Sequence, residues 1–350
     1  MTRTEKLRSL AAKQNKQGAF AVFNQANIKY FTNFSGATAV LIPQIGEATL
    51  FVSGTNYQQA KAEVKGFNVE LIKRGESVMQ KIAQQTQKAK LSVDTLAIES
   101  WRMLAKEVGG EDKLEPAYLF FRQLREVKDT EEILLIREAC KMADAGIKAA
   151  SEMIRPGVTQ KQIAAEAEYA MRKAGSDGVA FETIVSAGEY CAFPHGTNLD
   201  KIVCEGDFVT VDLGATNQFY CSDITRTFIA GKAAEKQQKI YEAVKQAHHR
   251  AYDKIESGVL AQKVDWAAWR VIDKAGYGDY FVHNLGHGVG IEVHEAPVLG
   301  PDSKDVLQEG NIVTDEPGIY LPGYGGVRIE DTVLVTENGA EKLTKSPYTV

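Results

Sequence analysis

Histidine is scarce in this 350-residue sequence, which has only six, and none of the four cysteines has a spacing typical of metal or redox sites. We therefore expect Cys140, Cys191, Cys204 and Cys221 to be reduced thiols in a cytoplasmic protein. The sequence has no run of about 18 apolar residues that would cross a membrane, and its N-terminus lacks the apolar core of a signal peptide. A formal net charge of −5 without a long basic run argues against nucleic-acid binding.

The length of the chain and the order of its predicted elements indicate two domains. In the N-terminal part, short apolar runs that alternate with helical segments predict strands at 18–23, 37–42, 48–52 and 68–72. Strands alternating with helices are typical of an α/β domain. We place this smaller domain at residues 1–124 and a second domain at residues 125–350.

The second domain is expected to be α+β, with helices grouped around mostly antiparallel strands. Capping candidates and acidic residues between Asp129 and Glu132 predict a helix start, and Pro156 predicts where that helix has ended. Thr159 and Gln162 form a capping-box pattern that opens a second helix. Further helical patterns lie at 233–256 and 262–274, and strand patterns at 179–187, 207–213, 218–229, 311–314 and 327–336.

Three of the six histidines fall within a dozen residues near the C-terminal end, and a fourth stands alone upstream: His283, His287 and His294, and then His195. Histidine and carboxylate side chains are the ligands that divalent transition metals prefer. Glycines beside His287 let the backbone approach a crowded site. We interpret this stretch as a candidate metal site, with a polar loop of satisfied histidines as the alternative. His248 and His249 fall in a polar helical pattern and are expected to be solvated.

Two aspartates are predicted to face each other across a hairpin. Residues 207–214 and 219–228 are strands by composition, and a turn at Asn217-Gln218 would place Asp212 directly opposite Asp223. Directly opposed residues have Cβ atoms about 4.5–5.5 Å apart. Two carboxylates this close repel each other unless a proton or a cation lies between them. Two solvated aspartates on the hairpin are the alternative.

Arg328 and Glu330 share one face of a predicted strand, because side chains two residues apart point the same way. Apolar neighbours favour burial of this strand, and a buried carboxylate needs a partner, which either a metal ion or Arg328 could supply. Four carboxylates and one imidazole suit two divalent ions better than a structural zinc. This candidate set consists of Asp212, Asp223, His287, Glu316 and Glu330.

In order and spacing, these motifs resemble those of the pita-bread metallopeptidases, in the branch of Xaa-Pro aminopeptidases and prolidases. The matching runs are Val-Asp212-Leu-Gly, Ser-Asp223-Ile-Thr-Arg-Thr, Gly-His287-Gly-Val-Gly, Glu316-Pro-Gly-Ile-Tyr and Arg328-Ile-Glu330-Asp. The resemblance is strong over residues 125–350 and implies a pita-bread catalytic domain there. It is weaker upstream, where it implies a creatinase-like α/β domain. The run from Val52 to Tyr57 departs from relatives, which often carry an Asp and an Arg there.

The resemblance also implies two divalent metal ions, with Mn²⁺ as the first choice and Co²⁺, Zn²⁺ or Fe²⁺ as alternatives. Asp223 and Glu330 would bridge both ions, Asp212 would complete one shell, and His287 and Glu316 would complete the other. Glu316 would also act as the general base.

Four residues outside the ligand set receive roles by the same resemblance. His294 would donate to the oxyanion of the tetrahedral intermediate. His195 would contact the proline side of the peptide and help to move protons. His283 and Arg328 would line the substrate pocket.

The function implied is hydrolysis of the N-terminal Xaa-Pro bond of proline-containing peptides by a bridging hydroxide, as in short bacterial Xaa-Pro aminopeptidases, and by a homodimer. A prolidase restricted to dipeptides is the main alternative. A metal-free creatinase-like enzyme and a non-enzymatic binding protein on the same fold are disfavoured, because all five ligand positions are filled. The additional N-terminal domain argues against a methionine aminopeptidase.

Overall fold

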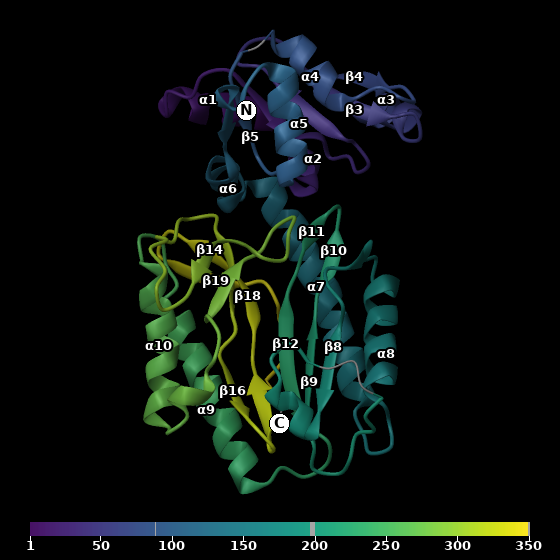
Figure 1. Ribbon diagram of the computed structural model, residues 1–350. Coiled ribbons are helices and arrows are strands. Elements are labelled where there is room, and N and C mark those ends of the chain that lie inside the picture. Colours follow the sequence, from purple (N-terminus) through teal and green to yellow (C-terminus); the bar gives the residue numbers. More distant parts are fainter. Residues whose placement is uncertain (88, 197–199, 349–350) are drawn as a thin grey trace. The chain divides into compact units, whose positions relative to one another are not determined.

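The computed structural model describes residues 1–87, 89–196 and 200–348. The chain forms two compact units, Met1–Arg125 and Glu126–Val350, which are purple to blue and teal to yellow in Figure 1. None of the helices in the described part of the chain is long and apolar enough to cross a membrane.

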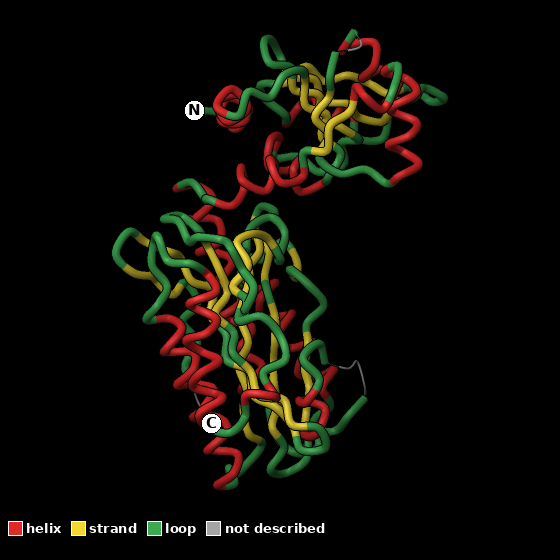
Figure 2. Tube along the Cα trace, turned by 60° about the vertical axis from the view of Figure 1, so that its left-hand side comes forward, coloured by secondary structure: helices red, strands yellow, loops and turns green. Residues whose placement is uncertain are grey.

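The N-terminal unit is built on a six-stranded sheet with the strand order β4-β3-β2-β1-β5-β6. Its strands are β1 (Ala19–Val22), β2 (Ala39–Ile42), β3 (Ala48–Ser53), β4 (Phe67–Ile72), β5 (Leu91–Val93) and β6 (Leu114–Pro116). Its helices are α1 (Arg3–Lys13), α2 (Gln25–Thr32), α3 (Tyr57–Glu63), α4 (Val78–Thr86), α5 (Ile98–Val108) and α6 (Tyr118–Glu126). Helices lie on either side of these strands in Figure 2. The four strands predicted from apolar runs correspond to β1 to β4, whereas β5 and β6 have only three residues each and were not predicted.

The C-terminal unit combines four long helices with short antiparallel strands. The helices are α7 (Thr130–Met153), α8 (Gln160–Lys173), α9 (Glu235–Tyr252) and α10 (Ala261–Lys274). The strands of its first half are β7 (Gly178–Val179), β8 (Ile184–Ala187), β9 (Phe208–Leu213), β10 (Ala215–Asn217), β11 (Tyr220–Cys221) and β12 (Ile224–Ile229). Those of its second half are β13 (Gly286–Gly288), β14 (Glu295–Leu299), β15 (Ile312–Asp315), β16 (Gly318–Leu321), β17 (Gly325–Arg328), β18 (Asp331–Thr336) and β19 (Gly339–Lys342).

The strands of this unit lie between two pairs of helices, α7 with α8 and α9 with α10 (Figure 1). Strand β9 shows how alternation builds the site, because successive side chains of a strand point to opposite faces. Val209, Val211 and Leu213 enter the hydrophobic core under α7 and α8. The residues between them, Thr210 and Asp212, therefore point into the interior of the sheet layer, where the site lies.

The predicted helix starts are confirmed by their hydrogen bonds. The Asp129 side chain accepts from the backbone N–H of Glu132, and the Glu132 side chain accepts from that of Asp129. Thr159 and Gln162 form the same reciprocal pair at the start of α8. Each pair satisfies two N–H groups that the first helical turn leaves without partners.

The hairpin that carries the two aspartates turns one residue later than predicted. Gln218 and Phe219 occupy the turn, with φ of 47° and 74°, although the sequence lacks the Asn-Gly signature of such turns. Moving a turn by one residue shifts the register by two, so Asp212 pairs with Thr225. The predicted direct opposition of Asp212 and Asp223 is therefore wrong. A shift of two residues keeps the same face, so both side chains still point to the same side.

Two strands predicted as continuous are interrupted where a candidate ligand lies. The predicted strand 218–229 is divided into β11 and β12, and Asp223 falls in the gap. The predicted strand 327–336 is divided into β17 and β18, and Glu330 falls in that gap. Residues in these gaps leave the regular ladder, so their backbone is held by other contacts.

One histidine is placed wrongly by the sequence pattern. His248 was expected to be solvated, but it lies on the inner face of α9 and is 0 % exposed. His249 is exposed as expected. The partners of His248 come from β15 and β18, far along the chain.

Candidate metal centre

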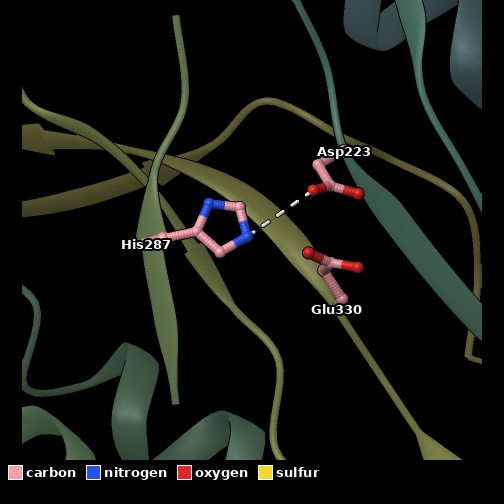
Figure 3. A group of neighbouring side chains, drawn as sticks. All are labelled: Asp223, His287 and Glu330. Atoms are coloured by element: carbon pink, nitrogen blue, oxygen red, sulfur yellow. Dashed lines mark ion pairs between the residues drawn. The ribbon is translucent and has the colours of Figure 1, made fainter. Parts of the chain in front are cut away.

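Three side chains from separate elements converge at the centre of the C-terminal unit. Ligand atoms of Asp223, His287 and Glu330 all lie within 4.8 Å of one another. Figure 3 shows the imidazole of His287 pointing toward both carboxylates. His287 Nε2 lies 3.7 Å from Asp223 Oδ2. Two carboxylates and one imidazole at such distances can bind a divalent cation.

His287 is held in the orientation that a ligand needs. Its Nδ1 lies 3.1 Å from the carbonyl oxygen of Gly288, which only accepts, so Nδ1 donates. Its backbone N–H donates to Thr314 Oγ1 (3.0 Å), and that hydroxyl donates to Glu316 Oε1 (2.9 Å). His287 Nε2 then lies 3.2 Å from Glu316 Oε1. These contacts direct Nε2 toward the carboxylates, as the outer hydrogen bonds of metal-bound histidines do.

Arg328 joins Asp212 to the same group. Its Nη2 donates to Asp212 Oδ2 (2.6 Å), and its Nε donates to Thr225 Oγ1 (3.0 Å). Thr225 Oγ1 in turn donates to Glu330 Oε2 (2.6 Å). A chain of short contacts thus links Asp212 with Glu330.

Three carboxylate oxygens at this centre are buried without a hydrogen-bond partner among the described residues: Asp212 Oδ1, Asp223 Oδ1 and Glu330 Oε1. Buried polar atoms are almost always hydrogen-bonded, and an unpaired buried charge is costly. All three oxygens belong to predicted metal ligands. A set of oxygen donors with one imidazole fits divalent cations such as Mn²⁺, Co²⁺ or Fe²⁺.

Burial raises the pKa of Asp223 well above its usual range, and the negative charge of Asp212 adds to this effect. Burial also raises the pKa of Glu330, with the charge of Asp223 as the next cause. At His287 burial lowers the pKa, but the hydrogen bond and charge of Glu316 outweigh it and raise the value to about 9. At Glu316 burial is likewise outweighed, and His287 lowers its pKa to about 2. A cation bound at His287 Nε2 would therefore replace a proton.

His294 lies beside the ligand group. Its ring centroid is 4.2 Å from that of His287, and its side chain is exposed. The following residue, Glu295, is anchored in the protein: Lys128 Nζ lies 3.4 Å from its Oε2, and the two side chains are 1 % and 4 % exposed. This buried ion pair fixes the backbone next to His294.

Tyr320 is a site residue that the sequence reasoning missed. Its hydroxyl oxygen lies 2.8 Å from His283 Nε2 and accepts a hydrogen bond from Arg328 Nη1 (2.9 Å). Thr225 and Thr314 were missed too. The alternation of side chains along a strand could have identified both. Thr225 lies two residues from Asp223, and Thr314 two residues from Glu316, so each shares the face of a candidate ligand.

His195 is exposed and follows Pro194, whose carbonyl oxygen accepts from Arg328 Nη1 (3.0 Å). After burial, the charge of His195 is among the causes that lower the pKa of His283 and of His294. The Pro194 contact places His195 one residue from a hydrogen bond of Arg328. The structure brings all nine predicted site residues into one neighbourhood.

The α+β fold, the oriented imidazole and the carboxylate oxygens that have no partner among the described residues are typical of a metal-dependent enzyme. The chain belongs to metallopeptidase family M24, whose model matches residues 135–337. The creatinase/prolidase N-terminal domain matches residues 3–127. The protein is therefore a metallopeptidase with a creatinase-like N-terminal domain.

Similar proteins include enzymes of both Xaa-Pro types. The Xaa-Pro dipeptidase of Pyrococcus furiosus is 41% identical over 350 residues, which cover 98% of each chain. The structure of an Xaa-Pro dipeptidase from Bacillus anthracis has a TM-score of 0.93 at 36% identity and covers 99% of this chain and 98% of its own. The X-Pro aminopeptidase of Thermotoga maritima has a TM-score of 0.89 at 33% identity and covers 99% of each chain.

Proposed function

We propose that this metallopeptidase is an Xaa-Pro dipeptidase, which hydrolyses the bond before proline in dipeptides. The observation that carries the hydrolase chemistry is the group of three buried carboxylate oxygens that have no partner in residues 1–87, 89–196 and 200–348, beside an oriented imidazole. The similarity to proteins named Xaa-Pro dipeptidase supports the choice of substrate. The sequence motifs alone favoured the aminopeptidase, so the order of the two alternatives is now reversed.

We further propose that two divalent ions, with Mn²⁺ as the first choice, are held by Asp212, Asp223, His287, Glu316 and Glu330. Asp223 and Glu330 are the shared ligands in this proposal. When bound, such ions lower the pKa of a water molecule and stabilise the charge that develops during attack. Glu316 takes up the proton of the attacking water on its carboxylate and later returns it to the leaving amine.

The remaining roles follow from exposure and position. His294 is exposed next to His287, where its imidazole N–H can donate to the developing oxyanion. His283 orients Tyr320 at the substrate side of the centre. Arg328 already uses four of its five side-chain N–H donors within the protein. Its main role is thus to position Asp212 and Tyr320, and one N–H that has no acceptor among the described residues can serve a substrate.

A free carboxylate lies one residue beyond the cut in a dipeptide, and its binding requires a cation or strong donors. We assign this contact to His195 together with the remaining N–H of Arg328, because Arg328 also holds the carbonyl next to His195. In a longer peptide the same position carries an uncharged amide. A donor placed for a carboxylate then loses its charged partner, which disfavours the longer chain.

A matched series of Xaa-Pro peptides from two to five residues tests the proposal. We expect kcat/KM for the dipeptide to exceed that for longer peptides at least tenfold, and dipeptides with alanine in place of proline to be poor substrates. Equal or faster release of the first residue from the longer peptides would make the protein an Xaa-Pro aminopeptidase. The similarity to the Thermotoga maritima enzyme favours that second candidate.

We also propose that the enzyme acts in the cytoplasm as a homodimer. Free thiols at all four cysteines support a reducing compartment. The dimer rests on the family resemblance, and light scattering on the purified protein measures it directly.

A further inference from the structure

The last described residues of the chain fold back onto buried charges next to the metal centre. Arg226 Nη2 and Asp331 Oδ1 form an ion pair at 2.7 Å, and their side chains are 1 % and 0 % exposed. Thr344 Oγ1 donates to Asp331 Oδ1 (2.8 Å), and the Tyr348 hydroxyl donates to Asp331 Oδ2. We call residues 344–348 the C-terminal clasp.

The clasp also holds the other partner of the ion pair. Arg226 donates to the carbonyl oxygen of Ser346 through Nη2 (2.6 Å) and Nε (3.2 Å). Its guanidinium carbon lies 4.7 Å from the centre of the Tyr348 ring, a cation–π contact. On its outer side the clasp is fastened to α7, since Asp144 Oδ1 accepts from the backbone N–H (2.7 Å) and the hydroxyl (2.6 Å) of Ser346.

His248 completes the group of charges. Its Nε2 lies 2.9 Å from Asp331 Oδ2, and its Nδ1 lies 3.0 Å from Asp315 Oδ2. Burial alone would lower the pKa of His248, but the two aspartates outweigh burial and raise it to about 9. Lys342 Nζ lies 3.3 Å from Asp331 Oδ2. Asp331 is therefore matched by several cations, whereas burial still raises the pKa of Asp315 despite the charge of His248.

Three pairs of consecutive residues join this face of the strands to the metal centre: Thr225 and Arg226, Asp315 and Glu316, and Glu330 and Asp331. Arg226 Nη1 donates to the carbonyl oxygens of Thr225 (3.0 Å) and Glu330 (2.5 Å). Glu330 lies in the gap between β17 and β18, where its backbone N–H donates to the carbonyl oxygen of Thr225 (3.1 Å) and Arg226 holds the carbonyl oxygens of both residues. Arg226 therefore fixes the backbone of a candidate bridging ligand.

We propose that the C-terminal clasp is a positioning element of the metal centre. By holding Arg226 and Asp331 in place, the clasp fixes the position of the Glu330 backbone. It also fixes the Thr225 hydroxyl, which donates to the Glu330 carboxylate. Both contacts determine where the carboxylate lies and therefore the affinity for metal. The inference rests on the proposed function, because it presumes that the centre binds divalent ions. Contacts outside the directly bound ligands commonly change metal affinity or activity by about 10–100-fold.

The Tyr348→Phe variant tests the proposal, because it keeps the ring over Arg226 and removes the hydroxyl that donates to Asp331, accepts from Lys342 Nζ and lies 3.2 Å from His248 Nε2. Tyr252→Phe is the matched control: the Tyr252 hydroxyl donates to the carbonyl oxygen of Ala340 (2.7 Å), and its ring lies 4.7 Å from Lys342 Nζ. Titration of metal-free protein with Co²⁺ gives the affinity, and the visible spectrum of bound Co²⁺ reports ligand geometry. We expect Tyr348→Phe to weaken Co²⁺ binding about tenfold with an altered spectrum, and Tyr252→Phe to match wild type.

A second variant, ending the chain at Lys345, removes the carbonyl partner of Arg226 as well and should weaken Co²⁺ binding further. Wild-type affinity and spectrum in Tyr348→Phe would overturn the proposal, as would equal weakening by both tyrosine variants. Failure of the wild-type protein itself to bind Co²⁺ would instead overturn the proposed function. With dipeptide substrate, loss of positioning should lower kcat more than it raises KM.

Discussion

Glu330 and Asp331 are consecutive residues with nearly equal burial, at 2 % and 0 % exposure, yet their surroundings are opposite. Glu330 Oε1 has no partner in the described part of the chain, and burial followed by the charge of Asp223 raises the pKa of Glu330 well above its usual range. At Asp331 burial is outweighed by Arg226 and His248, which hold its pKa well below its usual range.

Glu330 and Asp331 differ in their charged neighbours. Burial alone does not distinguish the two residues, but the presence of cationic partners does. At Asp331 the protein itself balances the buried charge, whereas the unbalanced charge of Glu330 favours a bound cation. Because consecutive side chains point to opposite faces, neighbouring residues can contribute one carboxylate to a metal site and the next to an ion pair.

Replacing Glu330 should have the largest effect on activity. Glu330→Gln removes a candidate bridging charge, so we expect kcat/KM to fall about 10³-fold or more and metal content to drop, since bound ions contribute several kcal/mol to catalysis. The metal-free variant should be at least as stable as the metal-free wild type, because an unbalanced buried acid is removed. Elemental analysis and urea unfolding in chelator measure both effects. A fully active Glu330→Gln enzyme would remove Glu330 from the ligand set.

Asp331→Asn should show the reverse pattern. The substitution leaves Arg226 without its balancing charge, and breaking a buried pair typically costs about 3–5 kcal/mol of the free energy of unfolding. The loss should appear in metal-free protein, where Glu330→Gln shows none. If urea unfolding of Asp331→Asn matches wild type, the contrast between the two faces fails.

His294→Ala tests a residue that lies next to the candidate ligands but is not one of them. Loss of one oxyanion donor typically lowers kcat about 10²–10³-fold, and we expect the metal content to stay that of wild type. His249→Ala, at an exposed position on α9, is the control and should leave kcat unchanged. Loss of metal from the His294 variant would show instead that His294 is a ligand.

The smallest expected effect is on pH dependence in metal-free protein. The folded-state pKa of Glu330 is raised above its unfolded value, so its contribution to stability is present below the unfolded pKa and is lost as the pH rises toward the folded pKa. Over that pH range, the free energy of unfolding of wild type should fall by up to about 1.4 kcal/mol per pH unit more than that of Glu330→Gln. This slope is the maximum for the release of one proton. Unfolding of both proteins in chelator between pH 5 and pH 8 measures it. If the stability of both proteins changes equally with pH, burial does not raise the pKa of Glu330.

The sequence predicted the ligand candidates because their signals are local. Alternation and motif order were sufficient to select Asp223, His287 and Glu330, which the structure brings together. The hairpin register was wrong, because nothing in the sequence distinguished a turn at Gln218-Phe219 from one a residue earlier. The fold class was predicted correctly from the succession of elements and the family resemblance.

The ion pairs of Arg226, His248 and Asp331 behind the metal centre could not be predicted. His248 sits in a polar helical pattern, and its partners come 67 and 83 residues later in the chain. The contacts of Arg328 to Pro194 and Asp212 were not predicted either, since they span 134 and 116 residues. Such long-range contacts leave no periodic signal in a single sequence.

A titration of metal-free protein with Mn²⁺ or Co²⁺, while Xaa-Pro dipeptide hydrolysis is followed, tests the proposed metal centre directly. We expect no hydrolysis in chelator and two ions bound per chain, with activity appearing as they bind. We also expect Glu330→Gln to bind fewer ions, whereas folded Asp331→Asn should still bind metal, though more weakly. Full hydrolysis by rigorously metal-free protein would contradict the claim that the unpartnered carboxylates form a metal centre.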